Sequence, residues 1–80
     1  MTPQDVRYVA FRDRLDLAHQ AFQQGMRRAA ALYDEECAVA DNDLNAIEAA
    51  EIAWWRSITA LRNAHNRAID ATWAQFRADS

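Results

Sequence analysis

Hydrophobic residues recur every three or four positions along almost the whole chain, which is the spacing of one face of an α-helix. In the first half this stripe consists of Phe11, Leu15, Ala18, Phe22, Met26, Ala29, Tyr33, Cys37 and Ala40. In the second half it consists of Leu44, Ile47, Trp54, Ile58, Leu61, His65, Ile69, Trp73 and Phe76. The pattern predicts an all-α fold: an antiparallel two-helix hairpin that forms a single domain over residues 1–80.

The expected helix boundaries come from capping residues. Thr2, Pro3 and Asp5 have the order typical of a helix start, so the first helix is predicted over about 3–40. Residues 41–43, Asp-Asn-Asp, are the turn formers that separate it from a second helix over about 44–78. Because no glycine or proline enforces this turn, one continuous helix stays open as an alternative, as does a break at Gly25 that would give three helices.

A turn near Asn42 fixes which residues face each other, because the numbers of facing residues then sum to about 84. The register predicts these pairs: Phe11 with Trp73, Leu15 with Ile69, His19 with His65, Met26 with Ile58, Tyr33 with Glu51, and Cys37 with Ile47. It also places the small Ala29 and Ala30 opposite the large Trp54 and Trp55, as interdigitation requires. We expect Phe22 and Trp54 to be core residues.

The apolar stripe is wider than one helix–helix seam can cover. Candidate interface aromatics are Trp54, Trp55, Trp73 and Phe76, and further apolar residues outside the seam are Leu17, Leu32, Val39 and Ile52. Leaving so much apolar surface in water is unusual for a monomer. We therefore expect self-association into a helical bundle, with a foreign partner protein as the alternative.

The cysteine content and the charges near the N-terminus indicate in which cellular compartment the protein is expected. Cys37 is the only cysteine among 80 residues, so no internal disulfide can stabilise the fold. Asp5, Arg7, Arg12 and Asp13 stand where a signal peptide would need an apolar core. No apolar run approaches the roughly 20 residues that span a bilayer. We expect a soluble, cytoplasmic protein with no membrane partner.

Charge is distributed unevenly along the chain. Residues 34–51 contain seven acids and no basic residue, whereas the remainder contains nine arginines and five acids, and the formal net charge is −3. In a hairpin these acids gather at the tip, and six of them form the candidate partner-binding set: Asp34, Glu35, Glu36, Asp41, Asp43 and Glu48. The seventh, Glu51, lies within the apolar stripe opposite Tyr33, whose hydroxyl would satisfy a buried carboxylate. The tip is either a contact for a basic protein surface or simply solvated.

The arginines offer a second candidate site. Arg27, Arg28 and Arg56 are expected near Trp54 and Trp55, where cations beside aromatic rings could bind a small anion such as a nucleotide. Direct nucleic-acid binding is not expected, because it requires a net basic footprint.

Motifs for catalysis or metal binding are weak. The acidic turn resembles an EF-hand loop, but Ala46 replaces the required glycine and Ile52 the bidentate glutamate. His19 and His65 are better explained as seam residues than as metal ligands. Ser57 and Cys37 lack an activating neighbour, and no glycine-rich phosphate loop is present. We expect no enzyme activity, no cofactor and no metal.

The leading hypothesis is a small non-catalytic interaction module that self-associates and binds a partner protein through the acidic tip or the spare aromatic face. Compact acidic proteins of this kind are often inhibitors encoded by phages or mobile elements, an analogy at the level of a class. The alternatives are a sensor or sequestering protein for a small anionic ligand, and a structural subunit of a larger assembly.

Overall fold

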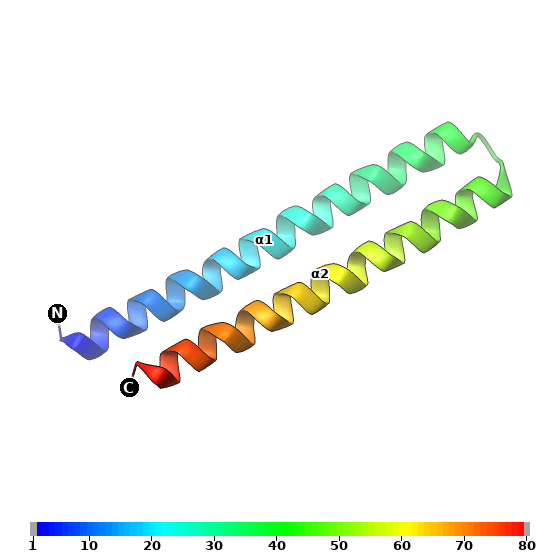
Figure 1. The fold of residues 1–80 in the computed structure, drawn as a ribbon. Helices are drawn as coiled ribbons and strands as arrows, with labels where there is room; N and C mark the ends of the chain where they lie inside the picture. The colour runs from blue at the N-terminus through cyan, green and yellow to red at the C-terminus, as the bar shows by residue number, and fades with distance from the viewer. Residues whose placement is uncertain (1, 80) are drawn as a thin grey trace.

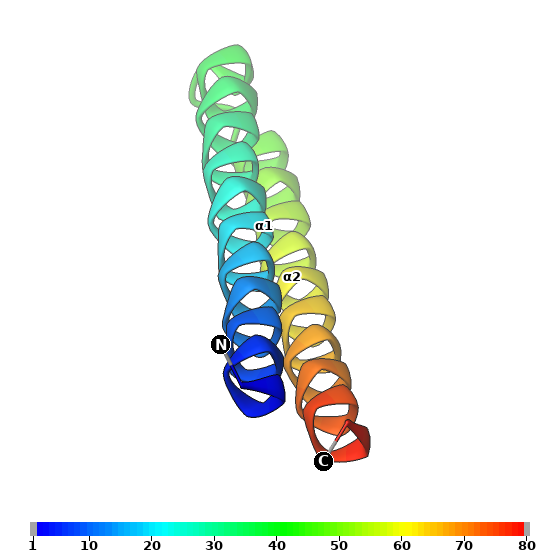
Figure 2. The ribbon, with the colours of Figure 1, turned by 90° about the vertical axis from the view of Figure 1, so that its left-hand side faces the viewer.

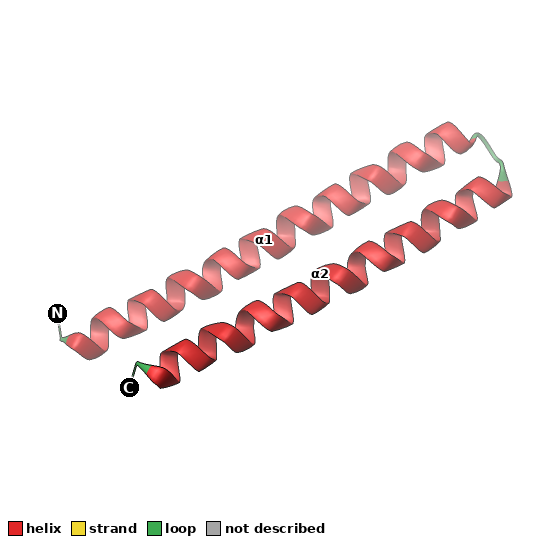
Figure 3. Ribbon diagram, viewed as in Figure 1, coloured by secondary structure: helices red, strands yellow, loops and turns green. Residues whose placement is uncertain are grey.

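The computed structural model describes residues 2–79 and contains two long helices, α1 (Pro3–Ala40) and α2 (Leu44–Ala78). They run antiparallel, side by side, joined by a short turn at one end of the molecule (Figure 1). The opposite end, where residues 3 and 78 lie, is called the terminal end below. All regular structure in the described residues is helical (Figure 3). The predicted all-α hairpin is confirmed, and neither the continuous helix nor the break at Gly25 occurs.

Helix α1 starts at a complete capping box. The Thr2 hydroxyl accepts a hydrogen bond from the Asp5 backbone N–H at 3.2 Å, and the Asp5 carboxylate accepts one from the Thr2 backbone N–H at 3.1 Å. Hydrogen bonds from the Thr2 side chain and from the Thr2 backbone N–H lower the pKa of the Asp5 carboxyl below its ordinary value, since they favour its charged form. Pro3 occupies the first helical turn, where its missing N–H costs no hydrogen bond.

The turn is made by side chains that tolerate a left-handed backbone. Asp41 has φ 44° and Asn42 has φ 68°, values that Asn and Asp adopt more readily than other non-glycine residues. Asp43 then caps α2, and its carboxylate accepts hydrogen bonds from the backbone N–H groups of Asn45 and Ala46. The chain therefore reverses direction without glycine.

The hairpin is a thin rod, one helix deep. Its Cα atoms span 60 × 18 × 7 Å, and the radius of gyration is 18.2 Å, against about 12 Å for a compact domain of 80 residues. Seen from the terminal end, the two helices lie side by side, and the described residues form no third layer (Figure 2). Neither helix, over residues 2–79, has a stretch apolar and long enough to cross a membrane.

Ring contacts establish the register of the seam. The ring centroids of Phe11 and Trp73 lie 4.7 Å apart, and His65 Nε2 lies 3.1 Å from His19 Nδ1. Both pairs are those that a turn near Asn42 predicts. Phe76 also packs against Phe11 at 4.7 Å and carries the Arg7 guanidinium over its ring at 4.3 Å.

Burial is sparse, which corrects part of the expected core. Within residues 2–79 the buried side chains are Phe11, Ala50, Ile58 and Thr72. Phe22 and Trp54 are only half-buried, because a single neighbouring helix covers one side of each ring. Glu51 is exposed, so the expected buried carboxylate on the seam is also wrong.

Candidate functional site

A hollow near the tip brings aromatic and acidic side chains from both helices together. Its volume is about 540 Å³, and we call it the aromatic–acidic hollow. Its lining residues are Ala30, Tyr33 and Asp34 of α1 with Glu51, Trp54 and Trp55 of α2. It combines members of two candidate sets that the sequence analysis treated separately, the acidic tip and the interface aromatics.

Helical spacing explains why these six side chains meet. On each helix the three lining positions follow steps of three and one, so they lie on one face of adjacent turns. Ala30 is small and stands opposite the tryptophans, which leaves open space where a larger residue would fill the hollow. The large-against-small pairing is the one that the register predicts.

The aromatic wall consists of three rings at angles to one another. Tyr33 and Trp54 have centroids 6.1 Å apart with an interplanar angle of 49°, and Trp54 and Trp55 lie 5.0 Å apart at 71°. Trp55 is 58% exposed and Trp54 is half-buried. Exposed indole faces of this kind present the negative side of their quadrupole to a ligand.

Electrostatics at the hollow are negative. The pKa of Tyr33 is raised above its ordinary value, first by a hydrogen bond with the Cys37 side chain and then by burial and by the charge on Cys37. The carboxylates of Glu51 and Asp34 raise this pKa further, because they disfavour a phenolate beside them. Two acids therefore act on the same aromatic wall from opposite helices. Tyr33 was predicted to hydrogen-bond Glu51, whereas the hydrogen bond that raises its pKa is with Cys37.

The hollow is chemically suited to a cation. Aromatic faces attract a guanidinium or ammonium group, and adjacent carboxylates can accept its N–H donors. A volume of about 540 Å³ falls within the range of small-ligand sites and accommodates a long basic side chain. The same carboxylates would repel a phosphate or another anion.

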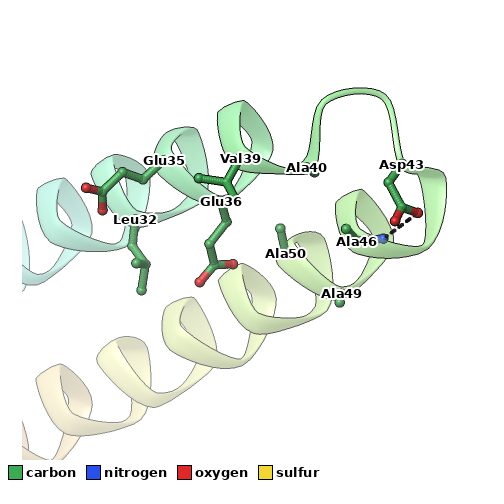
Figure 4. A pocket seen from close by; sticks show the side chains of 9 residues that line it. All are labelled: Leu32, Glu35, Glu36, Val39, Ala40, Asp43, Ala46, Ala49 and Ala50. Atoms are coloured by element: carbon green, nitrogen blue, oxygen red, sulfur yellow. Dashed lines mark hydrogen bonds between the residues drawn. The ribbon is translucent and has the colours of Figure 1, made fainter.

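Other acids of the tip lie elsewhere. Glu35, Glu36 and Asp43 border a separate groove with an alanine floor (Figure 4), which shares no lining residue with the aromatic–acidic hollow. Asp41 caps the end of α1, Asp43 caps the start of α2, and Glu48 is exposed. The acidic tip is thus divided between different faces of the hairpin.

The remaining interface aromatics belong to the terminal end. Trp73 and Phe76 pack on Phe11, and Trp73 lies 19 residues beyond Trp54, about 28 Å along a helix. They do not contribute to the hollow. Trp73 is nevertheless 44% exposed.

The three arginines proposed as an anion site do not share a pocket. Gly25 and Trp54 face the seam, and Arg27 and Arg56 each lie two residues further on, about 200° around their helices. They therefore lie on opposite outer edges of the hairpin. Arg56 borders a shallow depression with Trp55 that includes neither Arg27 nor Arg28.

The described part of the chain contains no cluster of side chains that could form a metal centre. His19 and His65 contact each other, and no group of three or more potential metal ligands is found within residues 2–79. The two histidines meet across the seam between the helices, as the sequence predicts.

Comparison with known proteins adds no relative. No family model matches this chain, and no curated protein or solved structure is similar enough to match it.

Two features of this region were not predicted from the sequence. One is the role of Ala30 and Tyr33 in the hollow, although the register already paired Ala30 with the tryptophans and Tyr33 with Glu51. The other is the groove of Figure 4, whose signal is alanine at steps of three and four along the second helix, away from the main apolar stripe.

Proposed function

We propose that this chain is a non-catalytic protein-binding module that holds an arginine or lysine side chain of a partner protein in the aromatic–acidic hollow. The observation that carries the proposal is the convergence of Tyr33, Trp54 and Trp55 with Asp34 and Glu51. A cation over an aromatic face is stabilised by about 0.5–1 kcal/mol when exposed and by about 2 kcal/mol when desolvated. The two carboxylates add charge-assisted hydrogen bonds.

A protein partner is favoured over a free anionic ligand. The hollow combines negative charge with aromatic surface, and the arginines that a nucleotide would need lie on separate outer edges of the hairpin. The seven acids in residues 34–51 would attract a basic protein surface before contact and speed association.

The expected partner surface is basic, and such surfaces commonly bind nucleic acid. Occupying one would make this chain an inhibitor of nucleic-acid binding by the partner. Cys37 is a free thiol, which agrees with a reducing compartment, so we propose that the protein acts in the cytoplasm.

The test compares a blocked Gly-Arg-Gly peptide with the same peptide containing citrulline, which keeps the shape of arginine without its charge. We expect the arginine peptide to bind and the citrulline peptide to bind at least ten-fold more weakly, measured by calorimetry at low salt. Trp55→Ala should weaken arginine binding about five-fold, which corresponds to about 1 kcal/mol.

A matched pair of charge variants separates local contact from long-range attraction. Asp34→Asn with Glu51→Gln removes two charges from the hollow, whereas Asp41→Asn with Glu48→Gln removes two charges from the same tip outside it. We expect the first pair to abolish discrimination against citrulline and the second to retain it. Equal losses in both would show that the hollow does not recognise the cation.

A further inference from the structure

A second surface, unrelated to the aromatic–acidic hollow, runs along one broad face of the hairpin. At the tip it forms a groove of about 570 Å³. Leu32 and Val39 of α1 and small residues of both helices form its apolar lining. Glu36 extends between the two helices, while Glu35 and Asp43 lie along the border of the groove (Figure 4). The small lining residues are Ala40, Ala46, Ala49 and Ala50. We call the face that bears this groove the alanine face.

The alanine face continues to the middle of the rod. A second hollow there is lined by Ala18, Ala21, Phe22, Leu61, Ala64, His65 and Ala68. Along α2, steps of four and three connect Ala50 in the tip groove to Ala64 in the central hollow and continue to Ala78. The positions reached are Ala46, Ala50, Ala53, Ser57, Ala60, Ala64, Arg67, Ala71, Ala74 and Ala78. Ala50 is already buried against α1, and eight of the other nine are alanine or serine, so another helix could approach closely along the exposed part of this strip.

Large apolar residues lie beside this flat strip on α1. Leu32 and Val39 are 51% and 85% exposed, and Leu17, one turn before Ala21, is 64% exposed. The chain exposes 6201 Å², whereas a compact monomer of its mass exposes about 4,900 Å². The excess, on the order of 1,300 Å², exceeds the roughly 800 Å² that each partner buries in a standard interface.

Charge along the alanine face reverses from one end to the other. Positions seven apart on α1 share one side of the helix, and this row reads Arg7, Arg14, Ala21, Arg28 and Glu35. Glu35 lines the tip groove and Ala21 lines the central hollow, which places the row on the alanine face. On α2 the strip carries Arg67 toward the terminal end. The tip of this face is therefore acidic and its terminal end is basic.

We infer that two copies of this chain pack alanine face against alanine face, antiparallel, about a two-fold axis beside Ala21 and Ala64. Each acidic tip groove then receives the basic terminal end of the other copy. The axis places Arg7 of one copy level with Glu35 of the other, since both lie 14 residues from Ala21. A dimer with both tips at one end would instead bring the three acids of one tip groove, Glu35, Glu36 and Asp43, against the same three of the other copy, which is unfavourable.

Side-chain sizes agree with the same axis. It places Leu32 of one copy level with Ala10 of the other, so a large residue meets a small one there. On α2 the strip meets its own symmetry mate around Ala64. The axis also brings Arg14 of one copy level with Arg28 of the other. These like charges lie at the border of the interface, where their long side chains can point away from each other into solvent. The product is a four-helix bundle in which all neighbouring helices are antiparallel.

A distance measurement tests the arrangement. A spin label at exposed position 38, introduced as Ala38→Cys in a Cys37→Ser background, lies 17 residues from the level of the axis. The antiparallel dimer predicts two labels about 50 Å apart, because each residue of a helix advances about 1.5 Å. A dimer with its tips together predicts a separation within about 25 Å, since only two helix diameters divide the labels. A short distance overturns the inference, as does a chain that stays folded and monomeric at high micromolar concentration.

A pair of adjacent substitutions provides the control. Ala64→Glu introduces a charge at the proposed axis, whereas Asn63→Glu introduces the same charge on the neighbouring exposed position outside the strip. We expect Ala64→Glu to weaken dimerisation at least 100-fold by sedimentation, with helix content retained, and Asn63→Glu to change it less than three-fold. Equal effects of the two, or a folded dimer in Ala64→Glu, would place the interface elsewhere.

Discussion

Leu61 packs directly onto Gly25 of the facing helix. A Cβ at Gly25 would overlap one Leu61 methyl group and lie 3.2 and 3.3 Å from Cδ1 and Cγ of the same side chain. Gly25 adopts an ordinary helical φ, so its role is the close approach and not backbone freedom. A glycine, which by itself weakens α1, therefore lies where the two helices touch.

Gly25→Ala measures this contact. Alanine favours the helix by about 1 kcal/mol over glycine, but displacing Leu61 costs about 1–3 kcal/mol. We expect net destabilisation in the parent and stabilisation by about 1 kcal/mol in a Leu61→Ala background, measured by urea unfolding. Gln24→Ala, on the neighbouring exposed position, is the control and should change stability by less than about 0.5 kcal/mol. Stabilisation in both backgrounds would mean that Leu61 does not fill the space beside Gly25.

The left-handed turn residues predict opposite effects of two small substitutions. Asn42→Gly should leave stability unchanged or raise it slightly, whereas Asn42→Ala should lower it by about 1 kcal/mol, because a Cβ disfavours φ 68°. Thermal melts of the two variants at equal protein concentration give the comparison. Equal melting temperatures would argue against a left-handed backbone at this position.

Burial predicts which aromatic residues support the fold. Phe11 is 9% exposed and contacts two rings, so Phe11→Ala should destabilise the protein by about 3–5 kcal/mol. Trp55→Ala should cost less than about 1 kcal/mol, because Trp55 is 58% exposed in the hairpin. Trp54 and Phe22, which are half-buried, should fall between them. A Trp55 variant as unstable as the Phe11 variant would indicate that Trp55 is covered in solution.

The raised pKa of Tyr33 can be tested by titrating its phenol group. In a Tyr8→Phe background its phenolate absorbance should appear above the ordinary pKa of 10.0, and Cys37→Ala should move the midpoint down more than Glu51→Gln does. Because the folded pKa is raised, the associated stability is fully present below pH 10.0 and declines as the pH rises through the folded pKa. A midpoint unaffected by Cys37→Ala would exclude the hydrogen bond between these side chains.

Most of the hairpin could be predicted from the sequence because its determinants are local. Thr2 and Asp43 act as caps, and the turn between the helices fixes which residues face each other, so the contacts of Phe11 with Trp73 and of His19 with His65 follow. Burial could not be predicted in the same way. The stripe that contains Phe22 and Trp54 indicates which side faces the seam, but one neighbouring helix cannot cover it.

The candidate site was predicted in part. Its acids and tryptophans were identified from charge and aromatic content, but their division between two faces depends on rotations of about 100° per residue, which separate Asp34 from Glu35. The same rotation carries Arg27 and Arg56 away from the seam. The alanine face was missed because alanine is a good helix former at any position, so its recurrence at steps of three and four is explained by helix propensity alone.

The most direct test of the aromatic–acidic hollow uses the three tryptophans as internal reporters. Their indole N–H resonances can be followed by NMR while the blocked Gly-Arg-Gly peptide is added, with the citrulline peptide as the control. We expect the Trp54 and Trp55 signals to shift with arginine, while the Trp73 signal, about 28 Å further along α2, stays in place. Equal shifts of all three signals, movement of Trp73 alone, or the same response to citrulline would contradict it.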